Sequence, residues 1–514
     1  MLDIILPPCC KERPVTAKKS RSAKKNKILF VASEAHPLIK TGGLGDVAGA
    51  LPIALKELKQ DVRLILPAYR EAMRRNGPYT IASLVFPPGT HPIRLLEGRL
   101  PDSNITVWLV DIPSLFDRPG NPYLGPDGHD WPDNAMRYGM FARAVTAIAL
   151  DQAGLDWHPD IVHCNDWQTG LIPTLLSMHT PRPATVFTIH NLAYQGLFPA
   201  AQFQELGLPA ELWGMHGLEF YDQLSFIKGG LLYADMINTV SPTYAKEICT
   251  PAFGCHLDGL LRSRADRLVG ILNGADYSEW NPEHDSHLPH HYSADKLQGK
   301  AADKAALQRE LGLPREPGIP LIGFIGRLVE QKGVDLILAV LGNLLRQSVQ
   351  IVILGSGNKA FEQALTTLAE HYPQRCHVRI GFSEPLAHRI EAAVDLFLMP
   401  SRYEPCGLNQ IYSMRYGTLP IVRRTGGLAD TVVDTADGLD NATGFVFDEP
   451  TASALAAAVQ RALDLYRTDP RGWRKLMHNA MTRDYSWRQS AGAYLDLYQQ
   501  ALRHQGQTNP SKAL

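Results

Sequence analysis

Residues 40–52 read K-T-G-G-L-G-D-V-A-G-A-L-P and follow a run of apolar residues, I-L-F-V-A at 28–32. Such a continuous apolar run is typical of a buried strand, and small and apolar residues then recur at helical spacing from 47 to 58. The sequence therefore predicts a strand, a glycine-rich loop and a helix in direct succession.

The glycines of this loop, Gly42, Gly43 and Gly45, allow positive φ and let a ligand approach the backbone closely. Free N–H groups at the start of the following helix attract an anion, and Lys40 adds a positive charge beside them. The loop is therefore a candidate phosphate-binding site. An ordinary strand-to-helix turn is the alternative, because a short glycine motif is not specific by itself.

The chain has 514 residues, more than one hydrophobic core usually supports, so two domains are expected. It is 45% apolar but has no run near the ~18 uninterrupted apolar residues of a membrane helix, which predicts a soluble protein. Eight basic and two acidic residues stand among the first 27, so the rest of the chain is net acidic. A general nucleic-acid-binding surface is therefore not expected.

The first 26 residues form a basic tail whose Lys, Ser and Ala content favours disorder. The positive charges follow the short apolar run at 1–6, so a secretory signal is not indicated, and an organelle transit peptide is a weak match. The seven cysteines are odd in number and lack C-x-x-C spacing. This argues against a disulfide framework or a zinc site and favours a reducing cytoplasm.

Strand-like apolar runs alternate with helix-length segments, which predicts parallel sheets covered by helices on both faces. The first series lies at 62–66, 105–110, 161–164, 185–189 and 236–240. The second lies at 321–325, 350–354, 378–380, 396–399, 419–422 and 445–447. We therefore expect an α/β protein with two doubly wound, Rossmann-like domains, whose ligand binds at the carboxyl ends of strands where the domains face each other.

A polar stretch rich in His, Asp and Pro at 276–291 separates the two series, and the segment 487–502 has the apolar spacing of an amphipathic helix. The expected domains are a basic disordered tail at 1–26, an N-terminal Rossmann-like domain at 27–275, a C-terminal Rossmann-like domain at 276–485 and a terminal helical segment at 486–514.

The second series opens with a strand that ends in G-R-L-V-E-Q-K-G, where Arg327 and Lys332 stand at the expected start of a helix. Two cations and a helix N-terminus suit a diphosphate better than a single carboxylate. A solvated helix end with Arg327 paired to Glu330 is the alternative. The first loop also matches G-x-G-x-x-A, but no acid ends a second strand at the distance that a dinucleotide site requires.

The run P-S-R-Y-E-P-C-G-L-N-Q at 400–410 follows an apolar strand and places Glu404 at its carboxyl end. An acid there can hold sugar hydroxyls or stabilise positive charge at a reacting carbon, although acids are also common in the first turn of a helix. Cys406 fits a packed thiol as well as a reactive one, because reactivity depends on exposure.

Seven motifs occur in one order along the chain. They are S-E-A-H-P-L-I-K-T-G-G-L-G-D-V from Ser33, N-D-W-Q-T-G from Asn165, T-I-H-N-L-A-Y-Q-G from Thr188, L-N-G-A-D from Leu272, G-R-L-V-E-Q-K-G from Gly326, S-R-Y-E-P-C-G-L from Ser401 and R-R-T-G-G-L-A-D from Arg423. Over about residues 27–490 the sequence resembles bacterial glycogen synthases and plant starch synthases. That resemblance implies the GT-B fold, with the N-terminal domain on the glucan acceptor side, the C-terminal domain on the donor side and a final helix that crosses back to the first domain.

The resemblance further implies a retaining glycosyltransferase that moves glucose from ADP-glucose to the non-reducing 4-hydroxyl of an α-1,4-glucan such as glycogen. Lys40, Arg327 and Lys332 would bind the diphosphate and stabilise it as the leaving group, so that no metal or other cofactor is expected. His190 and Glu404 would face the donor glucose, and Glu404, His190, Arg327 and Lys332 are the expected catalytic residues.

The other residues implied for the site fall into two sets. Those on the donor side are Gly42, Gly43, Asn273, Phe382, Cys406, Gly407, Leu408, Thr425, Gly426 and Gly427. Those that would hold sugar hydroxyls are Glu34, Asp46, Asp166 and Asn191. Taken from the residues alone, His190 fits a core histidine and Asp166 a strand-end turn just as well.

Donor and product share the α configuration, which either a covalent intermediate or attack on the leaving-group face explains. We favour same-face attack, in which the departing phosphate takes the acceptor proton, because the sequence does not place a nucleophilic carboxylate beneath the anomeric carbon. Closure of the two domains would exclude water and prevent hydrolysis of the donor.

Two positions depart from related sugar transferases. Phe382 stands where relatives often carry tyrosine, so stacking on the nucleotide base is kept but a hydroxyl contact is lost. Ile411 stands where many of them have a second glutamate, a difference that bacterial glycogen synthases share.

Three other functions remain open at this stage. The fold also suits an enzyme that uses UDP-glucose or a small acceptor, a glucan-binding relative without turnover, or a Rossmann oxidoreductase. The combination of Lys40, His190, Arg327, Lys332 and Glu404 argues against a pure binding protein, which has no need of paired cations for a diphosphate.

Overall fold

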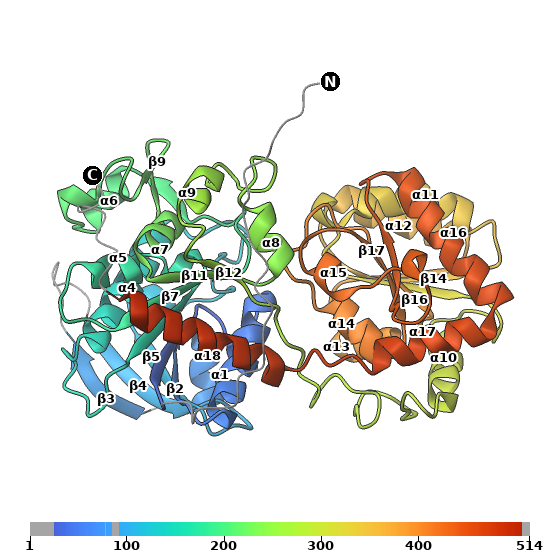
Figure 1. Cartoon of the computed structure of the whole chain (residues 1–514), viewed down its shortest axis with the longest axis horizontal. Coiled ribbons are helices and arrows are strands. Elements are labelled where there is room, and N and C mark those ends of the chain that lie inside the picture. The colour runs from blue at the N-terminus through green and yellow to red at the C-terminus, as the bar shows by residue number, and fades with distance from the viewer. Residues whose placement is uncertain (1–24, 78, 85–91, 506–514) are drawn as a thin grey trace.

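The computed structural model describes residues 25–505, apart from residue 78 and residues 85–91 (Figure 1). The predicted tail at 1–26 therefore lies outside the described residues except for its last two. Figure 1 shows two α/β units side by side, the first drawn in blue to green and the second in yellow to orange.

The first unit is built on a nine-stranded sheet with the order β12-β11-β7-β6-β1-β2-β5-β4-β3. Its central strand β1 (Lys27–Val31) pairs in parallel with β2 (Asp61–Pro67) and with β6 (Ile161–Asn165). The remaining strands are β3 (Tyr79–Leu84), β4 (Ile93–Arg99), β5 (Thr106–Asp111), β7 (Ala184–Ile189), β11 (Met236–Thr239) and β12 (Leu268–Gly270). β4 pairs antiparallel with both of its neighbours, so one edge of the sheet is mixed.

The second unit is built on a six-stranded sheet in which every pairing is parallel, with the order β15-β14-β13-β16-β17-β18. Its strands are β13 (Leu321–Ile325), β14 (Gln350–Gly355), β15 (Cys376–Ile380), β16 (Leu396–Met399), β17 (Leu419–Arg423) and β18 (Phe445–Phe447). The prediction of two doubly wound, Rossmann-like domains is confirmed.

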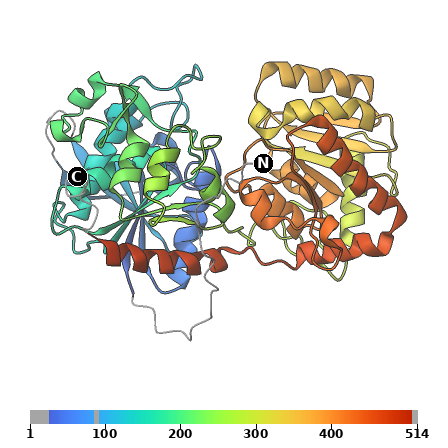
Figure 2. The same cartoon turned by 45° about the horizontal axis from the view of Figure 1, so that its top comes forward.

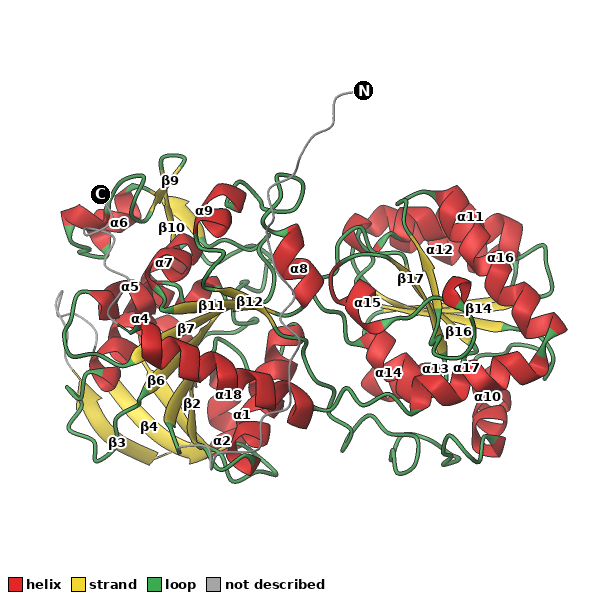
Figure 3. Ribbon diagram, in the orientation of Figure 1, coloured by secondary structure: helices red, strands yellow, loops and turns green. Residues whose placement is uncertain are grey.

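Helices cover both faces of the two sheets (Figure 3). In the first unit they are α1 (Gly43–Glu57), α2 (Arg70–Asn76), α3 (Pro113–Phe116), α4 (Asn134–Ala149), η1 (Trp167–Thr169), α5 (Leu171–Ser177), α6 (Ala201–Glu205), η2 (Ala210–Leu212), α7 (Phe226–Tyr233), α8 (Pro242–Glu247) and α9 (Asp258–Ser263). The later ones are α10 (Gln298–Glu310), η3 (Glu330–Lys332), α11 (Val334–Leu344), α12 (Lys359–His371), α13 (Glu384–Ala393), α14 (Asn409–Arg415), α15 (Gly426–Thr431), η4 (Thr435–Asp437), α16 (Ala452–Thr468), α17 (Pro470–Met481) and α18 (Trp487–His504). Among the described residues, no helix is both long and apolar enough to cross a membrane.

The sequence did not predict several short or edge strands, nor the antiparallel direction of β4. β3 and β4 were missed because their residues are only partly buried, so they lack the continuous apolar run of the central strands. A small separate sheet, β8 (Leu197–Pro199), β10 (Gln223–Ser225) and β9 (Glu219–Phe220), was missed because its strands have two or three residues each.

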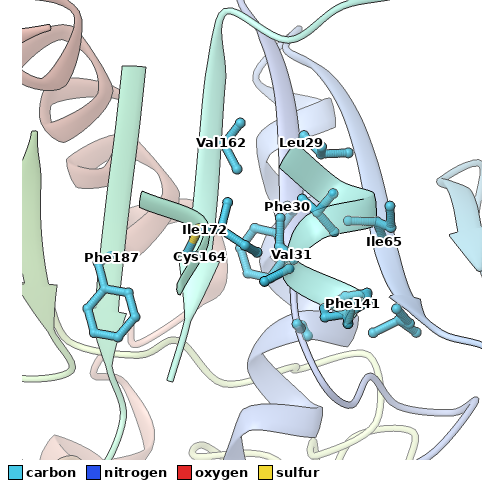
Figure 4. Packing of buried hydrophobic residues seen from close by; sticks show 14 of the residues in the cluster. Leu29, Phe30, Val31, Ile65, Phe141, Val162, Cys164, Ile172 and Phe187 are labelled. Carbon is cyan, nitrogen blue, oxygen red and sulfur yellow. The ribbon is translucent and has the colours of Figure 1, made fainter. Parts of the chain in front are cut away.

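The core of the first unit forms around β1, which is buried on both faces (Figure 4). Leu29, Phe30 and Val31 are fully buried and lie with Val162 of β6 and Ile172 of α5. Full burial of such side chains stabilises the fold by about 1.5–3 kcal/mol each. This explains why β1 appears in the sequence as an unbroken apolar run directly before the glycine-rich loop.

The glycine-rich loop differs from its prediction in one respect. Gly42 is extended, with φ −149° and ψ −166°, while Gly43 and Gly45 lie in the first turn of α1, so the predicted positive φ is wrong. Position 45 favours glycine because little space is left for a side chain: a Cβ there would lie 3.0 Å from Cγ of Lys40. A Cβ at Gly43 would meet no described atom within 4 Å, which leaves the start of α1 open to a ligand.

The two units are joined by two stretches of chain that run beside each other. Ala275 forms a parallel bridge with Ser486, and the Ala275 N–H donates to the Tyr485 carbonyl at 2.7 Å. Beyond this point α18 runs across the first unit (Figures 1 and 2). The other connection packs on the second unit, where the Trp280 ring stacks on His388 with centroids 3.7 Å apart.

Buried hydrogen bonds tie α18 to the central strands of the first sheet. Tyr498 donates from its hydroxyl to His163 Nδ1 at 2.8 Å, and His163 Nε2 donates to Thr188 Oγ1 at 2.6 Å. Thr188 then donates to Asn238 Oδ1 at 2.5 Å, and Asn238 Nδ2 donates to the Tyr494 hydroxyl at 3.2 Å. Burial lowers the pKa of His163 to about 3, so its ring is neutral and each donor in the chain faces an acceptor.

Removing one hydroxyl of this chain tests how strongly α18 is tied to the first unit. The Tyr498→Phe variant leaves His163 Nδ1 buried without a donor, which should lower the free energy of unfolding by about 1–3 kcal/mol. Urea unfolding measures this change, and Gln489→Ala on the exposed face of α18 is the matched control. Equal stability of the Tyr498→Phe variant and the control would show that the bond contributes nothing.

Candidate active site

The predicted site residues follow the carboxyl ends of neighbouring strands in both sheets. In parallel sheets these ends share one edge, where ligands bind. In the first unit, Glu34 and Lys40 follow β1, Asp166 follows β6 and His190 follows β7. In the second unit, the residues after the strands are Arg327 after β13, Phe382 after β15, Glu404 after β16 and Thr425 after β17.

The Glu34 side chain accepts hydrogen bonds from the glycine-rich loop. Its Oε2 accepts hydrogen bonds from the Thr41 hydroxyl at 2.7 Å, from the Gly42 N–H at 3.3 Å and from the Thr41 N–H. Burial raises the pKa of this carboxyl, and the bonds from Thr41 and Gly42 oppose that shift. The carboxylate therefore shapes the loop that precedes α1.

Lys40 and Asp46, which the sequence assigned to a phosphate and to sugar hydroxyls, are paired with each other. Lys40 Nζ lies 2.6 Å from Asp46 Oδ1, and the Lys40 side chain is 37% exposed. Burial raises the pKa of Asp46, and the charge of Lys40 opposes the shift. The lysine is thus held at the mouth of the loop by an acid of the first turn of α1.

Asp166 and His190 form one hydrogen-bonded unit at the ends of β6 and β7. Asp166 Oδ1 accepts from the His190 N–H at 2.8 Å, and burial raises the pKa of Asp166 to about 7. Asp166 has φ +57° and ψ 179°, a conformation that costs of order 1–3 kcal/mol in a residue other than glycine and is common at functional sites.

The hydrogen bonds of Asn165 determine the form of the His190 ring. Asn165 Nδ2 donates to the Val31 carbonyl at 2.9 Å, so its Oδ1 is the atom that accepts from His190 Nε2, also at 2.9 Å. His190 therefore carries its proton on Nε2 and has a lone pair on Nδ1. Burial lowers the pKa of His190 to about 3, which keeps the imidazole neutral.

Lys332 and Glu404, 72 residues apart in the sequence, form the central pair of the second unit. Lys332 Nζ lies 2.5 Å from Glu404 Oε2, which also accepts from the Ser401 hydroxyl at 3.0 Å. Glu404 is only 6% exposed. The chain turns between Lys332 and α11 at Gly333, where φ is +70° and a Cβ would lie 2.2 Å from the Pro400 carbonyl oxygen.

Arg327 reaches across to the first unit. Its Nη1 donates to the Tyr194 hydroxyl at 3.0 Å, and its Nη2 donates to Gln331 Oε1 at 3.2 Å. Both Arg327 and Tyr194 are exposed, so this pair is open to exchange with a ligand. The alternative pairing of Arg327 with Glu330 is not formed. Glu330 is instead near Arg402, with Oε1 3.6 Å from the Arg402 Nε.

Glycines at the end of β17 allow the backbone to pack directly against the Glu404 loop. A Cβ on Gly426, whose φ is +44°, would lie 1.9 Å from the Glu404 carbonyl oxygen, and one on Gly427 would lie 2.1 Å from that of Cys406. The Gly427 N–H donates to the Glu404 carbonyl at 3.1 Å. No larger residue fits at these two positions.

Cys406 is a packed thiol and not an exposed nucleophile. It is 4% exposed, and burial raises its pKa to about 12, opposed by a hydrogen bond from the Asn273 backbone N–H. Asn273 Oδ1 is buried without a hydrogen-bond partner among the described residues.

The remaining predicted residues lie at the ends of β7, β15 and β16. Asn191 Oδ1 accepts from the Ala193 N–H at 3.1 Å and shapes the turn after His190. Phe382 is 79% exposed, so its ring is free for a ligand. Gly407 has φ +72° and leads through Leu408 into α14.

Comparisons with known proteins match nearly the whole of this architecture. A model of the starch synthase catalytic domain matches residues 27–263, and a model of the group 1 glycosyl transferases matches residues 307–475. A glycogen synthase of Thioalkalivibrio sulfidiphilus is 58% identical over 478 residues, which cover 92% of this chain and 99% of the relative. The chain belongs to the glycogen and starch synthase family of glycosyltransferases.

Other members of the glycogen and starch synthase family agree in sequence and in fold. A glycogen synthase of Cellvibrio japonicus is 56% identical and covers 92% of this chain and 98% of its own length. The catalytic domain of starch synthase IV from Arabidopsis thaliana, bound to ADP and acarbose, superposes with a TM-score of 0.84 at 33% identity and covers 93% of this chain and 100% of its own. The fold and the family inferred from the motifs are thus confirmed.

The candidate site also contains residues for which no role was predicted from the sequence. Tyr194 lies inside a motif but shows its contact with Arg327 only in the folded chain. Ser401 bonds to Glu404, and Glu247 bonds to the Thr425–Gly426 turn. Neither contact is indicated by the sequence, because serine is a common residue type and Glu247 lies far from its partners along the chain. In the part of the chain that the structure describes, no group of three or more His, Cys, Asp or Glu residues is arranged to hold a metal ion.

The raised pKa of Asp166 predicts a stability that depends on pH. An unfolded aspartate has a pKa of about 3.9, so between that value and about 7 the folded chain holds a proton that the unfolded chain releases. The free energy of unfolding contributed by this residue therefore falls as pH rises through that window. Asp166→Asn keeps the acceptor for the His190 N–H without a charge, so its stability relative to the parent should be higher at pH 8 than at pH 5.

Urea unfolding at both pH values measures this difference, with Asp156→Asn on the exposed surface as the control. A relative stability of Asp166→Asn that is the same at pH 5 and pH 8 would mean that Asp166 ionises as an ordinary surface acid.

Proposed function

We propose that this protein is a retaining glycosyltransferase that transfers glucose from ADP-glucose to the non-reducing 4-hydroxyl of an α-1,4-glucan. The observation that carries the proposal is the ion pair of Lys332 with Glu404, which puts a phosphate-binding cation and a buried acid 2.5 Å apart at neighbouring strand ends. The high identity to glycogen synthases, and the ADP and acarbose named for the starch synthase IV structure, support this choice of donor and acceptor.

The donor diphosphate would exchange the partners of both cations. A diphosphate offers Lys332 and Arg327 several anionic oxygens, so it competes for them with Glu404 and with the neutral Tyr194 hydroxyl. Release from Lys332 frees the Glu404 carboxylate to accept from a glucose hydroxyl. The cations then stabilise negative charge that develops on the departing phosphate, which is electrostatic catalysis.

In this proposal the donor is also bound by backbone and aromatic groups. Lys40, the loop at Gly42 and the open start of α1 at Gly43 meet the diphosphate from the first unit, while Phe382 stacks on the adenine. Gly407, Gly426 and Gly427 have no side chain, which allows close packing of the backbone on the donor side. Asn273, Cys406, Leu408 and Thr425 complete that side as packing or backbone contacts.

The first unit would hold the sugars. His190 is neutral, with a lone pair on Nδ1, so it is suited to accept a hydroxyl and not to pair with phosphate. Glu34, Asp46, Asp166 and Asn191 supply acceptors around it. Same-face attack by the acceptor hydroxyl remains our proposal, with the C1–phosphate bond breaking, the new C1–O4 bond forming on that face and the hydroxyl proton passing to the phosphate.

A cytoplasmic location is part of the proposal. Among the described residues, Cys164, Cys255, Cys376 and Cys406 are free thiols, and Cys255 is partly exposed, which suits a reducing compartment.

Glucose incorporation into glycogen by the purified protein tests the proposal directly. With ADP-glucose as donor the parent should elongate glycogen, and Glu404→Ala should lower the rate at least ~100-fold, equivalent to about 2.7 kcal/mol of barrier, while remaining folded. Glu370→Ala on the exposed face of α12 is the matched control and should keep the parent rate.

The choice of donor and acceptor decides between the proposal and its rivals. Faster incorporation from UDP-glucose, or transfer to a monosaccharide in preference to glycogen, would reassign the enzyme to a different substrate. Glycogen binding without incorporation from either donor would replace the proposal by a non-catalytic glucan-binding protein.

A further inference from the structure

We propose that α8 is a strut between the two units that sets the spacing of the His190 loop and the Glu404 loop. In this view Glu247 and Thr243 are positioning residues for the transfer reaction, and the inference rests on the proposed function. α8 belongs to the first unit and lies on the side that faces the second, next to α15 (Figures 1 and 3).

Each of these two short helices carries an acid that binds the first turn of the other. Glu247, the last residue of α8, accepts through Oε1 from the Gly426 N–H at 3.0 Å and from the Thr425 hydroxyl at 2.9 Å. Asp430, near the end of α15, accepts from the Thr243 N–H at 2.9 Å and from its hydroxyl at 2.6 Å. Four charge-assisted hydrogen bonds therefore fix α8 against α15, and such bonds are roughly twice as strong as neutral ones.

On the side of the second unit, the contact passes directly to the catalytic loop. The residue after Gly426 donates from its N–H to the Glu404 carbonyl at 3.1 Å, and Gly426 leaves no room for a Cβ against that same carbonyl. A shift of the start of α15 therefore moves the backbone of Glu404, because no flexible side chain lies between them.

On the side of the first unit, α8 is fixed to the loop that carries His190. The Tyr244 hydroxyl accepts from the Leu192 N–H at 3.1 Å, two residues beyond His190, and Tyr244 is 2% exposed. Ser241 caps the helix by accepting from the Tyr244 N–H at 2.9 Å. One face of α8 thus contacts the His190 loop while its two ends bind α15.

Two other contacts between the units are unsuited to fix this spacing. Arg327 bonds to Tyr194 through two exposed side chains, and the donor would take Arg327 away from that partner. His36 lies 3.6 Å from Glu279, and both side chains are partly exposed. None of the side chains that we assign to the phosphates takes part in the hydrogen bonds between α8 and α15. These hydrogen bonds therefore persist while the donor binds.

Loss of the strut should affect transfer more than donor binding. When the two loops move apart, the acceptor hydroxyl is misplaced and water gains access to the donor sugar, so hydrolysis of ADP-glucose replaces part of the transfer. For Glu247→Ala we expect a kcat for glycogen elongation at least tenfold lower, a KM for ADP-glucose within threefold of the parent, and an increased ratio of free glucose to transferred glucose.

Two comparisons separate positioning from general damage. Glu247→Gln keeps an oxygen that accepts both hydrogen bonds, so it should recover most of the lost kcat, and Asp430→Ala at the other end should reproduce the Glu247→Ala profile. Lys246→Ala, an exposed neighbour on the same helix, should behave as the parent. Because each unit has its own core, melting temperatures should stay close to that of the parent.

Several outcomes would overturn the inference. An unchanged kcat and hydrolysis ratio in Glu247→Ala would do so, as would a loss of activity that Glu247→Gln fails to recover in a folded protein. If Glu247→Ala does not fold, Asp430→Ala at the other end replaces it, and parent behaviour of that variant would also count against the strut.

A physical readout keeps the test independent of the enzyme assay. Fluorescent labels on the two units should show a broader distance distribution in Glu247→Ala than in the parent and in Lys246→Ala. An unchanged distribution would refute the strut. A parent protein that transfers no glucose would refute the proposed function instead, whatever the labels show.

Discussion

The ion pair between Lys332 and Glu404 is the interaction on which the rest of the site depends. It exists because β13 and β16 are neighbours in a parallel sheet, so the segments after them meet at one edge. Gly333 lets the chain turn next to Pro400, and Gly426 with Gly427 lets α15 pack against the Glu404 backbone. The carboxylate is thereby held, nearly buried, beside a cation for which a diphosphate would compete.

The first unit offers a different chemistry. His190 is kept neutral by burial, and its tautomer is set by Asn165, while Asp166 holds the His190 backbone from a strained conformation. Behind these residues, α18 extends the polar interior through Tyr494 and Tyr498. Most of the cations that suit a phosphate thus lie on the second unit. The neutral or acidic acceptors that suit sugar hydroxyls lie mainly on the first unit. The contacts between α8 and α15 bring the two halves to one spacing.

Much of this was predictable from the sequence, and what was not has physical reasons. The strands at 321–325, 396–399 and 445–447 were predicted to the residue, because strands buried on both faces are continuous apolar runs. β3 and β4 were missed because they are partly exposed. The start of α1 was placed four residues late, since the glycines suggested a loop, whereas Gly43 and Gly45 lie in the first turn of the helix and only Gly45 lacks space for a side chain.

The sequence predicts the residues of the candidate site but not the contacts among them. The motifs indicated Lys40, Asp46, Lys332 and Glu404, yet the pairing of Lys40 with Asp46 and of Lys332 with Glu404 follows from the packing of distant segments. Binding of ADP and AMP by calorimetry tests the central claim, that Lys332 exchanges Glu404 for the donor diphosphate. The account predicts that ADP binds the parent protein more tightly than AMP and that Lys332→Ala removes most of this preference. A preference for ADP that is unchanged in Lys332→Ala would contradict it.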